Sequence, residues 1–109
     1  MKSSTKLQPI CLPSLKILGD YWTLRIIDEL SRGPQRFCEL ERRLEGVNTA
    51  TLTKRLKAMY DDGLVARNEV SRADVTYALS GLGIEALPLL DAVNHFSKFA
   101  QHASEPVTR

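Results

Sequence analysis

The chain has 109 residues, of which 43% are hydrophobic and 26% are charged, and its formal net charge is +2. These values are typical of one globular domain and exclude a disordered chain, and no apolar run approaches the ~20 residues of a membrane span. Because no apolar core of a signal peptide follows the polar first eight residues, we expect a cytoplasmic protein that has no membrane partner.

Apolar periodicity predicts two helices in the first third of the chain. A short helix over 13–18 should end at Gly19. In the next segment Trp22, Ile26 and Leu30 recur at four-residue steps, which is helical spacing. Asp20 is expected to cap this second helix at its start.

A second pair of helices is predicted over about 36–62. Apolar residues recur at helical spacing from Arg36 to Gly46 and again from Thr49 to Asp62, with Asn48 or Thr49 as the N-cap of the later helix. Gly63 should end that helix. Two helices joined by a short linker over 45–48 form a helix-turn-helix motif.

After residue 63 the apolar period changes from 3.6 to 2. Residues 75–79 alternate apolar and polar, 64–70 do so less cleanly, and 71–74 should form the hairpin loop. A final helix should run from the cap Ser80 to about residue 102, kinked or divided at Pro88.

The order of these elements predicts a mainly α fold with a small β-hairpin, a winged helix-turn-helix domain over residues 9–103. The hairpin over about 64–79 would be the wing, and 80–102 the C-terminal helix. Segments 1–8 and 104–109 are expected to be flexible.

The later helix of the motif has the side chains of a recognition helix. With Leu52, Leu56 and Met59 toward the core, its exposed side has small residues, hydroxyls and cations. Such a helix enters the major groove of duplex DNA by its N-terminal end. The residues expected to bind DNA are Arg36, Asn48, Thr49, Thr51, Lys54, Arg55, Lys57 and Arg72, with Arg36 and Arg72 mainly on phosphates.

Two other interpretations remain open. Exposed basic side chains most often serve solvation alone, so the weight of this pattern comes from its position in the motif. The low net charge also fits a winged-helix module that binds a protein and not DNA. We find no Ser/His/Asp or Cys/His set, no phosphate-binding glycine loop and no zinc spacing, and therefore expect no enzyme, no cofactor and no metal.

Several short motifs, in order from Cys11 to about Phe99, resemble the HxlR branch of the MarR-like winged-helix regulators. They are Leu18-Gly19 with Trp22-Thr23-Leu24, Gly33-Pro34-Gln35-Arg36-Phe37, Thr51-Leu52-Thr53-Lys54-Arg55-Leu56 with Asp62-Gly63-Leu64-Val65, and Val75-Thr76-Tyr77-Ala78-Leu79.

The resemblance implies a homodimer that binds a pseudo-palindromic operator on the nucleoid, as a repressor or activator of transcription. In that family the first and last helices form the dimer interface. The positions expected there are Leu12, Leu15, Leu87, Leu90, Val93, Phe96 and Phe99. The alternative is that both sides of the last helix pack on the core of their own chain.

Cys11 raises the question of an effector. Some members of the family sense oxidants or electrophiles through a cysteine at this place, and a thiol near a helix N-terminus tends to have a lowered pKa. An oxidant or other small-molecule effector acting on Cys11 is one hypothesis, and a reduced, packed cysteine is the other. Cys38 follows the core residue Phe37 and is expected to be packed.

Overall fold

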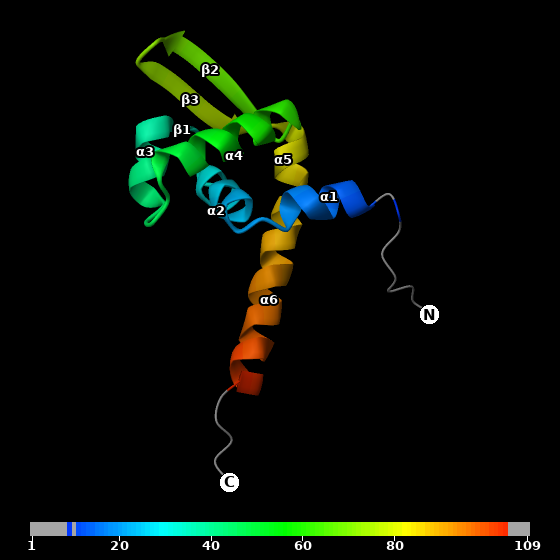
Figure 1. The fold of residues 1–109 in the computed structure, drawn as a ribbon. Helices are drawn as coiled ribbons and strands as arrows, with labels where there is room; N and C mark the ends of the chain where they lie inside the picture. The colour runs from blue at the N-terminus through cyan, green and yellow to red at the C-terminus, as the bar shows by residue number, and fades with distance from the viewer. Residues whose placement is uncertain (1–8, 10, 105–109) are drawn as a thin grey trace.

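The structure is a computed structural model that describes residues 9 and 11–104 (Figure 1). In chain order its elements are α1 (Cys11–Leu18), α2 (Tyr21–Leu30), β1 (Gln35–Arg36), α3 (Phe37–Arg43), α4 (Thr49–Asp61), β2 (Val65–Ser71), β3 (Asp74–Leu79), α5 (Gly81–Glu85) and α6 (Leu87–Ser104). The predicted fold class, helices with a small hairpin, is confirmed. The segments 1–8 and 105–109, expected to be flexible, lie outside the described residues, whereas Ser104 belongs to α6 and not to the tail.

Side chains at the helix starts set where these elements begin. Asp20 accepts a hydrogen bond from the Thr23 amide at the start of α2, and Asn48 accepts one from the Thr51 amide at the start of α4. Ser80 does the same for the α5 residue Gly83. These three caps satisfy amides that have no partner within their helices, as the sequence predicted.

The final helical segment is divided, which confirms the alternative of a break near Pro88. α5 ends at Glu85 and α6 begins at Leu87, so the proline occupies the second residue of α6. Proline is tolerated in a first helical turn because its missing amide hydrogen would have no intrahelical partner there.

The sheet contains a strand that the sequence did not predict. Its order is β1-β3-β2, all antiparallel, and β1 pairs Gln35 with Tyr77 and Arg36 with Thr76. We expected the third helix to begin at about Arg36, but that residue is extended and is the N-cap of α3. The buried Gln35 fixes this strand because its Nε2 donates a hydrogen bond to the Glu29 carbonyl oxygen at 2.7 Å.

The core lies where α2, α3 and α4 meet the base of the wing. Its fully buried large side chains are Ile26, Ile27, Leu40, Leu44, Leu52, Leu56 and Met59. From this body the wing extends on one side and α6 on another, and the lower part of α6 projects away from the other elements (Figure 1). No helix within the described ranges has both the length and the apolarity that a bilayer span requires.

Candidate nucleic-acid interface

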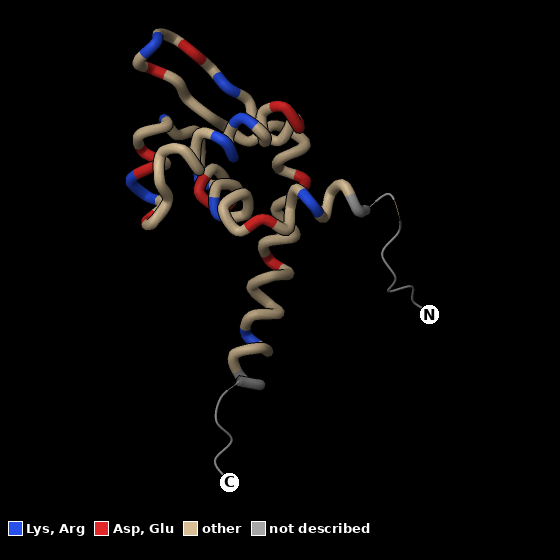
Figure 2. Tube along the Cα trace, viewed as in Figure 1, with Lys and Arg blue, Asp and Glu red and all other residues tan. Residues whose placement is uncertain are grey.

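The N-terminal half of α4 presents its polar side to solvent. Leu52, Leu56 and Met59 are buried, and Asn48, Thr49, Lys54 and Lys57 are exposed, whereas Thr51 is half-buried. This is the orientation that the apolar spacing predicted for the helix. Lysine and arginine positions lie along α4 and on the wing, on the same side of the molecule (Figure 2). The arrangement combines hydroxyls, amides and cations, which are the groups that bind base edges and phosphates.

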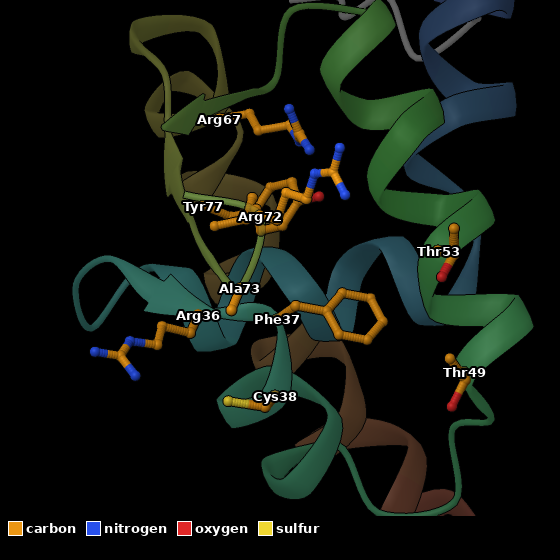
Figure 3. Close-up of a pocket in the computed structure, with 10 residues that line it drawn as sticks. Arg36, Phe37, Cys38, Thr49, Thr53, Arg67, Arg72, Ala73 and Tyr77 are labelled. Carbon is orange, nitrogen blue, oxygen red and sulfur yellow. The ribbon is translucent and has the colours of Figure 1, made fainter. Parts of the chain in front are cut away.

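A groove of about 420 Å³ separates α4 from the wing (Figure 3). Thr49 and Thr53 line it from α4, and the guanidinium groups of Arg67 and Arg72 lie between the wing and the helix. Arg36 also lines the groove, although its guanidinium group points away from the helix in this view. A groove lined by arginines and hydroxyls has the chemistry to hold a phosphate backbone.

Two of these groove residues, Thr53 and Arg67, were absent from the predicted set. Thr53 lies on the flank of α4 that faces the wing, which the periodicity of one helix does not reveal. Arg67 reaches the groove because it pairs across the sheet with Tyr77. The hydrogen bond to the Tyr77 side chain, and then the one to Glu69, raise the pKa of the Arg67 guanidinium group above its usual value. Like any arginine, Arg67 is cationic at every physiological pH.

Two of the groove arginines form ion pairs with carboxylates at the protein surface. Arg36 Nε lies 3.4 Å from Asp74 Oδ1, and Arg67 Nη1 lies 2.9 Å from Glu69 Oε1. All four side chains are more than a third exposed. Surface pairs of this kind contribute about 0–1 kcal/mol, so a phosphate can compete with the carboxylate for either arginine.

Arg55 differs from the other predicted DNA-binding residues. Its Nε lies 2.8 Å from Asp20 Oδ2 and its Nη2 lies 3.1 Å from Asp20 Oδ1, a two-pronged ion pair within the domain. Lys57 pairs with Asp61 on the same helix at 3.0 Å, and the Thr49 hydroxyl donates to the Glu41 carboxylate. Lys54 has no ion pair with any residue that the structure describes.

The predicted dimer positions divide into three groups. Leu87 and Leu90 are partly buried and pack against the core of their own chain. Val93, Phe96, Phe99 and Leu15 are exposed. The side chain of Leu12 lies outside the described residues.

The two cysteines have different positions. Cys11 is the first residue of α1, and its side chain lies outside what the structure describes. Cys38 is exposed and lines the groove beside the wing, so the expectation that it is packed was wrong. It occupies the second residue of α3, where the adjacent Phe37 and not the thiol turns toward the body of the domain (Figure 3). Among residues 9 and 11–104, no group of three or more His, Cys, Asp or Glu side chains is placed to hold a metal ion.

Comparisons with known proteins agree with this architecture. The HxlR-like helix-turn-helix family model matches residues 17–105. The HTH-type transcriptional regulator YdzF of Bacillus subtilis is 36% identical over 81 residues, which cover 72% of this chain and 74% of YdzF.

Solved structures of regulators share the fold. A MarR-family transcriptional regulator from Porphyromonas gingivalis is 30% identical, with a TM-score of 0.76 over 90% of this chain and 97% of that one. Reduced YodB from B. subtilis is 24% identical and matches with a TM-score of 0.75 over 94% of this chain and 100% of its own, which shows the common fold. With the match over residues 17–105 and the MarR-type winged-helix architecture, the chain belongs to the HxlR-like helix-turn-helix family, whose curated relatives are transcriptional regulators.

Proposed function

We propose that this protein is a homodimeric transcriptional regulator that binds a pseudo-palindromic sequence in duplex DNA through α4 and catalyses no reaction. The observation that carries the proposal is the exposed N-terminal half of α4, with its amide, hydroxyl and ammonium groups, beside a groove that Arg36, Arg67 and Arg72 line. In a cytoplasmic regulator this surface would meet the DNA of the nucleoid.

The residues of this surface divide into two roles. Asn48, Thr49, Thr51 and Lys54 belong to the end of α4 that would enter the major groove, where amides, hydroxyls and cations distinguish base pairs. The other basic residues surround that end and would hold phosphates, which position the protein without reading sequence. This second set consists of Arg36, Lys57, Arg67 and Arg72.

The competing function is a winged-helix module that binds a protein. It shares the fold, and the net charge of +2 is compatible with it. The two functions differ in how the affinity responds to salt. Contacts to DNA phosphates release counterions, so the logarithm of the affinity for DNA falls linearly with the logarithm of the salt concentration.

Selection from a random 30-base-pair library should therefore recover a duplex that the protein binds with a steep salt dependence. Lys54→Glu should weaken binding to that selected duplex by about tenfold or more, because it places a carboxylate near base edges and phosphates. Lys98→Glu changes the charge equally on α6, on an exposed position, and should bind as wild type. Failure to recover any duplex, or a salt-independent affinity, would favour the protein-binding module.

The same assay tests an effector that acts on Cys11. The position of this residue at the N-terminus of α1 supports the proposal, because helix N-termini favour the reactive thiolate. A structure of quinone-bound YodB from B. subtilis shares this fold, with a TM-score of 0.75. A thiol oxidant or quinone should change the affinity of wild type and of Cys38→Ser for the selected duplex, and should leave Cys11→Ser unchanged. A response that survives in Cys11→Ser would reject this role.

A further inference from the structure

One ion pair connects the middle of the recognition helix to the start of α2. Asp20 Oδ2 accepts hydrogen bonds from the Thr23 amide at 2.9 Å, the Thr23 hydroxyl at 3.1 Å and Arg55 Nε at 2.8 Å, while Oδ1 accepts one from Arg55 Nη2 at 3.1 Å. The Arg55 and Asp20 side chains are 36% and 29% exposed, so the pair is partly shielded from solvent. The carboxylate that caps α2 thus also binds α4, 35 residues away in the sequence.

The carboxylate itself is held in place by its own helix. Its two bonds from Thr23 fix it against the first turn of α2. The preceding residue, Gly19, ends α1 so closely that an added Cβ would lie 2.7 Å from the Leu15 carbonyl oxygen. The Asp20 carboxylate is therefore held by hydrogen bonds at the junction of α1 and α2.

At its N-terminal end α4 also contacts α3 through the hydrogen bond from the Thr49 hydroxyl to the Glu41 carboxylate, and its contact with the core comes from Leu52, Leu56 and Met59. Burial of Leu52, Leu56 and Met59 decides which side of α4 faces the core. Because the hydrophobic effect is non-directional, however, this burial sets the rotation of the helix about its own axis only coarsely. A guanidinium fork on a carboxylate is directional, because both nitrogens must meet both oxygens. The ion pair thus adds a directional restraint on the rotation of α4, which the apolar contacts lack.

We propose that Arg55 and Asp20 are positioning residues for DNA recognition: their ion pair fixes the rotation of α4, and Arg55 is not itself a DNA contact. The inference rests on the proposed function. Base-edge hydrogen bonds need donor and acceptor within about 3.2 Å and good alignment, so a loosened α4 loses sequence readout before it loses phosphate contacts.

Asp20→Asn is the most informative variant. Asparagine caps helices as well as aspartate does, so α2 should still begin at the same residue. It cannot form the ionic fork, so Arg55 is released. If Arg55 were a DNA contact, its release would leave the affinity for DNA unchanged or raise it. If Arg55 is a positioning residue, the affinity falls.

Arg55→Lys completes the comparison without a change of charge. Lysine serves as a phosphate contact but offers no fork for a carboxylate. Asp28→Asn is the matched control because it removes a carboxylate from the same helix, one that pairs with Arg32 at the surface at 3.5 Å. The net charge changes as in Asp20→Asn, and the link to α4 stays intact.

The experiment measures affinity for the selected duplex and for a scrambled duplex, across a salt series, well below the melting temperature of each variant. Asp20→Asn and Arg55→Lys should each bind the selected duplex about tenfold more weakly, with the double variant no weaker than either single variant. Affinity for the scrambled duplex, the salt slope and the control variant should be as in wild type.

Two results would overturn the positioning role. One is an Asp20→Asn variant that binds the selected duplex as tightly as wild type or more tightly. The other is an equal loss of affinity for selected and scrambled duplexes. A wild-type protein that binds neither duplex would instead reject the proposed function, and this outcome is visible without any variant.

Discussion

The Asp20 carboxylate shows how one side chain links local structure to stability. Its hydrogen bond with Arg55 is the largest influence on its pKa and lowers it; burial acts in the opposite direction, and the bonds from Thr23 lower it further. The net effect is a pKa below the value of about 3.9 for an aspartate in an unfolded chain. The folded state therefore holds the proton less strongly than the unfolded state does.

The sign of the resulting pH dependence follows from that difference. The stabilisation is present in full above the unfolded-state pKa and is lost as the pH falls through the lowered folded-state pKa. Wild type should exceed Asp20→Asn in free energy of unfolding by about 1 kcal/mol at pH 7, a figure that allows for solvent screening. Urea unfolding of both proteins should show this difference shrinking as the pH falls from 5 to below 3. A difference that stays constant or grows toward low pH would contradict the assignment.

At the scale of single elements, the sequence predicts those features whose cause lies within a few residues of the chain. The starts of α2, α4 and α5 were predicted because the caps Asp20, Asn48 and Ser80 act within four residues of their own positions. β1 was missed because a strand of two residues has no period, and its existence depends on pairing Gln35 with Tyr77 across the fold.

In the candidate site, too, the sequence predicts the orientation of one helix but not which residues of other elements lie beside it. Apolar spacing oriented α4, since burial of Leu52 and Leu56 fixes which side is exposed. It could not show that Asp20 lies opposite Arg55, or that Arg67 and Thr53 line one groove, because those proximities arise from tertiary packing. Periodicity describes one helix at a time and contains no information about the neighbouring element.

The packing of α5 against the wing gives a prediction at this scale. A Cβ added to Gly83 would meet the Leu64 backbone, with the carbonyl carbon at 3.2 Å, and would lie 3.0 Å from Leu79 Cδ2. Gly83→Ala should therefore lower the free energy of unfolding by about 1–3 kcal/mol, as overpacking does. Gly81→Ala lies in the same short helix with open space around it, and should be neutral or stabilising by up to about 1 kcal/mol. Equal stabilities of the two variants in urea unfolding would show that α5 does not pack closely on Leu64.

At the scale of the whole molecule, α6 leaves part of its apolar side exposed in the single chain. Its first turn packs against the core through Leu87 and Leu90. Further along, Val93, Phe96 and Phe99 are 41%, 69% and 65% exposed, three residues apart on one side of the helix. Contiguous apolar surface of this kind is uncommon on monomers and marks association sites. The proposed function requires a second copy of the chain, because a two-fold pair presents two recognition helices to two half-sites, and we propose that α6 of this second copy covers the exposed side.

Replacing both aromatic residues tests that assembly directly. Phe96→Glu with Phe99→Glu should convert a dimer into a folded monomer, since both side chains are exposed in the single chain and contribute little to its core. Val70→Glu is the control, because Val70 is an equally exposed apolar residue but lies on the wing. Sedimentation equilibrium should give the mass of two chains for wild type and Val70→Glu, and of one chain for the double variant. A dimeric double variant would mean that the two chains meet elsewhere, and a monomeric wild type would remove the two-fold symmetry on which recognition of a pseudo-palindromic operator depends.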